Sequence, residues 1–221
     1  MKVEAYEEIK RRIIELVYAP GTKLSEARLA EELGCGRSPI RTAFARLQAE
    51  GFIAVSPQSG TYVRALTEQE IRDIIDCRLL LETHVTRLAA THIEAEQLRR
   101  LRVAFRRLAP QGRELSSGVF EDFDELDSMF HTTIYQAAGN AAMTGILFNL
   151  LEKVRWIKKS FPSTPKRMKL SFTEIERVLE ALEERDADAA AQRMREHIGN
   201  AADFAASFRK EAASRRQRAA A

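Results

Sequence analysis

Three side chains that could bind a metal ion lie on the apolar faces of predicted helices. Asp127 and His131 are four residues apart, a spacing that places both on one side of a helix. His197 lies on the apolar face of a later predicted helix, from which it can complete a site for one divalent ion. A lone buried histidine is more often a core side chain with satisfied hydrogen bonds, so both interpretations stay open.

A second polar pair lies in the helix predicted to run from about Thr67 to His92. Arg78 falls in the apolar stripe of this helix, and Glu82 follows one turn later at its edge. A charge that faces a core is costly unless it is paired. The two residues therefore either form an internal ion pair that braces the helix, or Arg78 lines a cavity and binds a carboxylate ligand.

Residues 24–47, LSEARLAEELGCGRSPIRTAFARL, predict two short helices joined by a tight turn. Ser25 is a favoured N-cap residue and Gly34 a favoured residue for ending a helix. We expect Ser38 to cap the second helix and Pro39 to be its first residue, where the missing N–H costs nothing.

The start of this second helix is predicted to present polar and basic side chains to solvent. Arginine there can bond guanine O6 and N7 bidentately in the DNA major groove. A solvated charged face is the alternative. The predicted DNA-reading residues are Arg37, Ser38, Arg41 and Thr42.

The flanking segments complete a winged helix-turn-helix. An amphipathic helix is predicted within residues 3–17, and two short strands within residues 52–63 are joined by a turn that can use a positive φ at Gly60. The tip of such a hairpin can contact DNA phosphates or the minor groove. The predicted contact residues of the wing are Gln58, Ser59, Gly60 and Thr61.

Composition is that of an ordinary globular protein. The chain has 221 residues, of which 45% are hydrophobic, and a formal net charge of +3, so a nucleic-acid partner would need a local basic patch. With only two cysteines, the sequence does not predict a disulfide framework. No apolar run is long enough for a signal core or a membrane span, and we expect a cytoplasmic protein that does not enter a membrane.

The remainder predicts a helical domain at 67–208, after a winged domain at 1–66. Capping boxes at 67–70 and 171–174 predict helix starts, and Asp186 is expected to cap the last helix. A polar loop is predicted at 109–118. Residues 209–221 are expected to be a basic C-terminal tail without an apolar pattern, either frayed or a solvated helix end.

The first sixty residues resemble the DNA-binding domain of GntR-family bacterial transcription regulators. Two positions depart from the usual pattern: Gly36, where serine or threonine is common, and Thr42, where glutamate is common. Both touch the base-reading end, so the operator sequence of relatives is not transferred. The resemblance rests on Ala19-Pro20-Gly21, Leu24, Leu29-Ala30, Leu33-Gly34, Arg37-Ser38-Pro39-Ile40-Arg41, Ala43, Arg46-Leu47, Glu50-Gly51 and Gly60-Thr61-Tyr62-Val63.

The rest of the chain resembles the FCD effector-binding domain of the FadR subfamily, through Arg78, Leu81-Glu82, Asp127 to His131, Gly139-Asn140, Glu180 to Leu182, Asp186 and His197-Ile198. Metal-binding members hold an ion with one aspartate and three histidines beside a small carboxylate effector, whereas other members use no metal. Asp127, His131 and His197 match three of those ligands. Ile175 stands at the fourth, which removes a ligand but leaves a set of two histidines and one carboxylate for zinc or a similar divalent ion.

The sequence thus predicts a mainly α protein, with a winged helix-turn-helix followed by an antiparallel all-α bundle. The resemblance implies a homodimeric regulator, more commonly a repressor, that binds double-stranded operator DNA and a small organic acid. A metal-dependent enzyme and an architectural DNA-binding protein without effector are the alternatives. The predicted effector-binding residues are Arg78, Glu82, Asn140 and Arg155.

Overall fold

The computed structural model describes residues 4–108, 117–161 and 163–219, and most of the polar loop predicted at 109–118 lies outside them. The chain forms two compact units. The first comprises Met1–Ile71 together with Glu152–Ser160, and the second comprises Arg72–Leu151 together with Phe161–Ala221. None of the described helices combines the length and apolar character that a membrane span requires.

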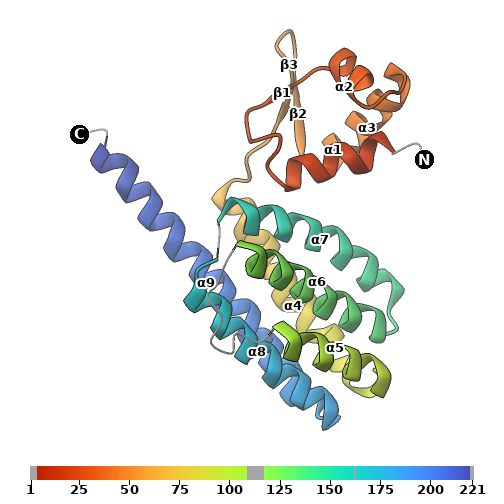
Figure 1. Cartoon of the computed structure of the whole chain (residues 1–221), viewed down its shortest axis with the longest axis vertical. Helices are drawn as coiled ribbons and strands as arrows, with labels where there is room; N and C mark the ends of the chain where they lie inside the picture. Colours follow the sequence, from red (N-terminus) through yellow and green to blue (C-terminus); the bar gives the residue numbers. More distant parts are fainter. Residues whose placement is uncertain (1–3, 109–116, 162, 220–221) are drawn as a thin grey trace. The chain divides into compact units, whose positions relative to one another are not determined.

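The N-terminal part of the first unit is a winged helix-turn-helix. β2 and β3 form the predicted antiparallel hairpin, and β1, which the sequence analysis did not predict, adds to the other side of β3. The register pairs Val55 with Thr61 and Lys23 with Tyr62. The elements, labelled in Figure 1, are α1 (Ala5–Ile14), β1 (Lys23–Leu24), α2 (Glu26–Glu32), α3 (Arg37–Ala49), β2 (Ile53–Ser56) and β3 (Gly60–Val63).

An apolar core holds these elements together. Ile9 and Ile13 of α1, one helical turn apart, are fully buried, as is Leu47 of α3. The ring of Phe52 lies 5.3 Å from that of Trp156, which comes from the segment Glu152–Ser160 of the same unit. Full burial of each such side chain contributes about 1.5–3 kcal/mol, so α3 is held firmly against the rest of this unit.

Two N-cap residues were predicted within the helix-turn-helix, and one of them is confirmed. Ser25 caps α2 as predicted, because its Oγ accepts a hydrogen bond from the backbone N–H of Arg28 at 3.4 Å. The prediction for Ser38 was wrong: α3 begins at Arg37, and Gly36 is its N-cap without a side-chain bond. Pro39 is tolerated there because the first-turn N–H groups have no partner inside the helix.

The remaining elements are helices, as predicted for this region. The capping box predicted at the start of the first of these helices is confirmed. Glu70 Oε2 accepts from the N–H of Thr67 at 2.9 Å, and Thr67 Oγ1 accepts from the N–H of Glu70 at 3.1 Å. The helices are α4 (Glu68–His92), α5 (Ala95–Leu108), α6 (Ser117–Ala137), α7 (Ala141–Ser160), α8 (Pro165–Glu183) and α9 (Ala187–Ala219).

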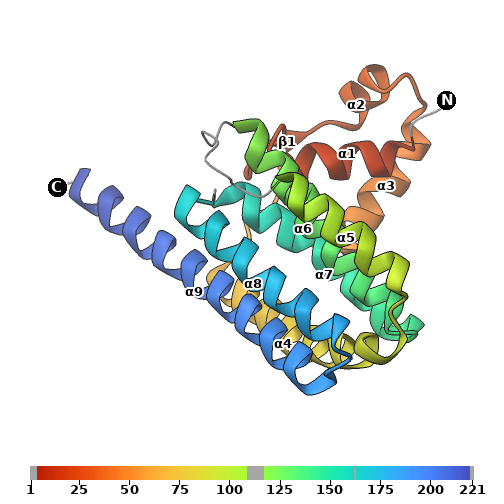
Figure 2. The ribbon, with the colours of Figure 1, turned by 60° about the horizontal axis from the view of Figure 1, so that its bottom comes forward.

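The second unit is a helical bundle around one apolar core. Figures 1 and 2 show α8 and α9 lying side by side, joined by a short corner, and α5 packs against both α6 and α8. Phe105 and Phe172 meet edge to face with ring centroids 5.8 Å apart. Asp186 caps α9, as predicted, by accepting from the N–H of Ala189 at 2.9 Å.

One predicted helix start in this unit was wrong. The helix expected to start at Ser171 begins at Pro165, because Thr164 is its N-cap and Pro165 occupies the favoured first position. Its Oγ1 accepts from the N–H of Arg167 at 3.2 Å. The basic tail predicted at 209–221 continues α9 as far as Ala219, and a helix end was one of its two expected forms.

Thr164→Ala is expected to lower the free energy of unfolding by about 1 kcal/mol, since it removes an N-cap hydrogen bond. Thr173→Ala is the matched control, because Thr173 is exposed within the same helix and alanine has the higher helix propensity. Chemical denaturation of both variants measures the difference. Equal stability of the two would contradict the cap at Thr164.

Candidate functional site

The three predicted metal-ligand residues come together inside the second unit. Asp127 and His131 project from α6, and His197 projects from α9; all three are buried. The Nε2 atoms of both histidines lie 3.8 Å from Asp127 Oδ1. One ligand atom from each residue lies within 4.8 Å of the other two, and the imidazole rings are stacked with centroids 5.5 Å apart.

A carboxylate stands behind each imidazole. Glu174 of α8 accepts from His197 Nδ1 at 2.9 Å, and a carboxylate oxygen of Glu82 of α4 lies 2.7 Å from His131 Nδ1. A carboxylate at Nδ1 places the proton there and leaves the Nε2 lone pair for a ligand. In both residues that free nitrogen is the one nearer Asp127.

The pair predicted in α4 is present and buried. Arg78 Nε donates a short hydrogen bond to Glu82 Oε1, and both side chains are almost inaccessible to solvent. Burial disfavours the charged form of Glu82, but Arg78 and His131 outweigh it and hold the pKa of this carboxyl well below its usual range. Glu82 therefore carries a full charge between a guanidinium and an imidazole.

Glu174 is held in the same way from the other side of the cluster. Arg167 Nη1 donates to Glu174 Oε1 at 2.8 Å, and Nη2 bonds the second oxygen. Burial opposes ionisation, yet His197 and Arg167 hold the pKa of Glu174 at about 2. Burial also lowers the pKa of His197 despite this carboxylate, which favours the neutral imidazole that metals bind.

In the first unit, the predicted base-reading residues lie on the outer side of α3. Arg37, Ser38, Arg41 and Thr42 are all exposed. The side chain of Arg41 is 68% exposed, and its Nε donates to Glu26 Oε2 at 2.8 Å. The hydroxyl of Thr42 donates to the carbonyl of Ser38 at 3.2 Å, so this donor is satisfied by its own helix.

The wing has a tight tip. Gln58 and Gly60 have positive φ values of 64° and 122°, and the hydroxyls of Ser59 and Tyr62 lie 2.7 Å apart. A Cβ at Gly60 would come within 2.8 Å of Lys23 Cε, so glycine lets this lysine pack across the tip. Lys23 was not predicted as a basic residue of the wing, because its place beside Tyr62 depends on the unpredicted β1–β3 pairing.

Two family models match the sequence. The FCD domain family matches residues 73–200, which is more than half of the chain, and the family described as bacterial regulatory proteins, gntR family, matches residues 1–63. The chain belongs to the GntR family. It is a DNA-binding transcription regulator with an FCD domain, as the resemblance implied.

Relatives of this GntR regulator agree with that assignment. It is 29% identical to the HTH-type transcriptional repressor RspR of Escherichia coli K12, over 94% of the chain and 90% of the relative. It is 31% identical to the gluconate operon transcriptional repressor of Bacillus licheniformis, over 78% of this chain and 69% of the relative. Among solved structures, E. coli McbR/YncC superposes with a TM-score of 0.77 at 18% identity, covering 92% of this chain and 95% of that one. The two sequence relatives are transcriptional repressors and the matched families are those of regulators, so the enzyme alternative is set aside.

The FCD domain lacks the fourth metal ligand of the metal-binding members at the position that the sequence predicted. Ile175 is completely buried in the apolar core and offers no ligand atom. Its neighbour Glu174 is engaged by Arg167 and His197 and so supports the site from behind. Neither role was predicted: Arg167 lay before the helix start expected at Ser171, and Glu174 was assigned to the capping box of that start.

Two predicted effector residues are used elsewhere. Asn140 Oδ1 accepts from the N–H of Met143 at 3.1 Å and so caps α7. Arg155 belongs to the first compact unit, where it lies 3.6 Å from Glu15 and 3.5 Å from Glu152. Their roles in effector binding stay predictions.

Proposed function

We propose that this regulator is a homodimeric repressor whose FCD domain binds a divalent metal ion and, with its help, a small organic acid. The convergence of Asp127, His131 and His197 carries the proposal. The acid would bind two states of the dimer with different affinities, and its binding would therefore change the affinity of the dimer for the operator. Each winged domain would take one half-site of a palindromic operator, with Arg37 and Arg41 contacting bases.

The ligand set suits a divalent ion such as zinc. Two neutral imidazoles and one carboxylate leave coordination positions open for water or an effector carboxylate. Ligand atoms bound at about 2.1 Å lie roughly 3–3.4 Å apart around one ion. The separations of 3.8 Å from Asp127 to each histidine are slightly wider, so small side-chain movements would close the site.

The proposed effector is an acid because the surroundings also provide a buried cation. In the described residues, Arg78 uses only Nε for its hydrogen bond to Glu82, which leaves its terminal nitrogens to bind a carboxylate. One relative is named for a gluconate operon, and gluconate is a hydroxylated carboxylic acid. This supports the class of effector and does not identify it.

His131→Ala is expected to abolish stoichiometric metal binding, because it removes one of three ligands. His84→Ala is the matched control: His84 is exposed on α4 and lies outside the cluster. The protein is stripped with a chelator, reloaded with Zn²⁺, and its metal content is measured by mass spectrometry. Equal metal content in the two variants would exclude the site.

The effector is tested separately, with the metal-loaded full chain. Thermal shifts against hydroxylated and dicarboxylic acids should identify a ligand, and titration of a selected operator should show weaker binding in its presence. An architectural DNA-binding protein would give a flat thermal response and unchanged operator affinity. Loss of the thermal shift in Arg78→Leu, with folding checked by circular dichroism, would support the assigned carboxylate contact.

A further inference from the structure

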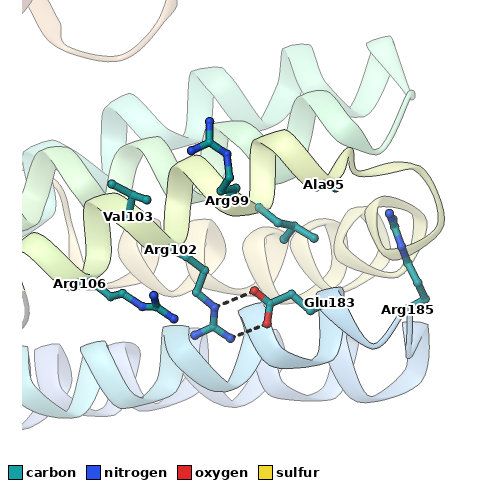
Figure 3. Close-up of a pocket in the computed structure, with 8 residues that line it drawn as sticks. Ala95, Arg99, Arg102, Val103, Arg106, Glu183 and Arg185 are labelled. Atoms are coloured by element: carbon teal, nitrogen blue, oxygen red, sulfur yellow. Dashed lines mark hydrogen bonds and ion pairs between the residues drawn. The ribbon is translucent and has the colours of Figure 1, made fainter.

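A second, basic site lies on the FCD domain, away from the buried cluster. A pocket of about 390 Å³ opens between α5 and the corner that joins α8 to α9. Figure 3 shows its side chains, and it shares no residue with the set Asp127, His131 and His197. Its lining residues are Ala95, Leu98, Arg99, Arg102, Val103, Arg106, Glu183 and Arg185.

The charges in this pocket are not balanced. Four arginines face one carboxylate, that of Glu183. Arg102 binds it through two hydrogen bonds of 2.8 Å, which are drawn in Figure 3. Arg99 is paired outside the pocket with Glu96. The remaining positive charge is therefore that of Arg106 and Arg185, which lie at opposite ends of the pocket in Figure 3.

Arg106 is the most available of these groups. It is exposed, and within residues 4–108, 117–161 and 163–219 its guanidinium makes no hydrogen bond or ion pair. In Figure 3 it extends toward the guanidinium of Arg102. Two adjacent guanidinium groups repel each other unless an anion lies between them, and Glu183 is already engaged by Arg102.

Arg185 has an unusual backbone. Its φ is 59°, a left-handed conformation in which glycine is the usual residue after a helix. The guanidinium donates to the carbonyl of Ala90 at 3.1 Å, which fixes the side chain beside the pocket. One Nη is used there, so other N–H groups stay available to a ligand. Strain at a basic residue that lines a pocket is a feature of ligand-binding sites.

From these observations we propose that the pocket binds a small, multiply charged oxyanion carried by an organic molecule. Guanidinium groups bind phosphate and carboxylate oxygens bidentately, and several of them in one pocket favour a ligand with more than one negative charge. Leu98 and the half-exposed Val103 supply apolar surface for its organic part. Di- or triphosphate esters and tricarboxylates share this chemistry.

The test uses isothermal titration of the full chain with pyrophosphate and, in a second arm, with citrate. Arg106→Gln should weaken binding of the preferred anion about tenfold, because it removes a charge-assisted hydrogen bond. Arg107→Gln is the matched control, since Arg107 is the next residue on α5, is exposed, and does not line the pocket. Glu183→Gln should strengthen binding several-fold, because it removes the competing carboxylate.

The two arms distinguish the source of the oxyanion. Tighter binding of pyrophosphate assigns a phosphorylated ligand, and tighter binding of citrate assigns a polycarboxylate; both support the site if Arg106→Gln weakens them. Equal losses in Arg106→Gln and Arg107→Gln would show unspecific attraction and overturn the proposal. Absence of binding of both anions at about 10 mM would also overturn it.

Discussion

Glu82→Leu is expected to lower the free energy of unfolding by about 3–5 kcal/mol, the cost of breaking a buried ion pair by removing one partner. Arg78 and Glu82 are both buried, and the substitution leaves the guanidinium of Arg78 without its carboxylate. It also removes the group that faces His131 Nδ1. Urea denaturation monitored by circular dichroism measures the change.

Two controls separate the buried charge from the loss of a glutamate. Replacing both partners, Arg78→Leu with Glu82→Leu, should be less destabilising than Glu82→Leu alone, since no unpaired charge stays buried. Glu96→Leu removes a solvent-exposed carboxylate that pairs with Arg99 and Arg100, and little change is expected. A double variant that is less stable than Glu82→Leu would refute the explanation by unpaired charge.

Arg37→Ala and Arg41→Ala are each expected to cost about 1–3 kcal/mol of discrimination between operator and unrelated DNA. Both side chains lie exposed at the start of α3, the element that a helix-turn-helix places in the major groove. The operator is first selected from a random DNA library with the full chain. Fluorescence anisotropy then gives affinities for operator and competitor DNA at fixed salt concentration.

The control for this prediction is Arg11→Ala. Arg11 is also exposed, but it lies on α1 and pairs with Glu8, so operator discrimination should be unchanged. A substitution that weakens binding to all DNA sequences alike indicates a phosphate contact instead of a base contact. That result for both Arg37 and Arg41 would remove them from the set of base-reading residues.

The sequence by itself determined the fold class and most helices. Helical periodicity and capping are local, so the start of α4 at the Thr67–Glu70 capping box and the cap of α2 by Ser25 follow from a few neighbouring residues. The spacing of four residues between Asp127 and His131 likewise predicts that both lie on one face of α6. Where two local signals competed, as at Thr164 and Ser171, pattern alone chose the wrong start.

Only the tertiary structure decided which charged residues meet across helices. Glu174 lies 2.9 Å from His197 Nδ1, although the two residues are 23 positions apart. Arg102 pairs with Glu183 across 81 positions. Such pairs depend on how helices pack, and no periodicity within one helix encodes them. The sequence therefore supplied the ligand atoms, and the packing of α4, α6, α8 and α9 supplied the carboxylates that orient them.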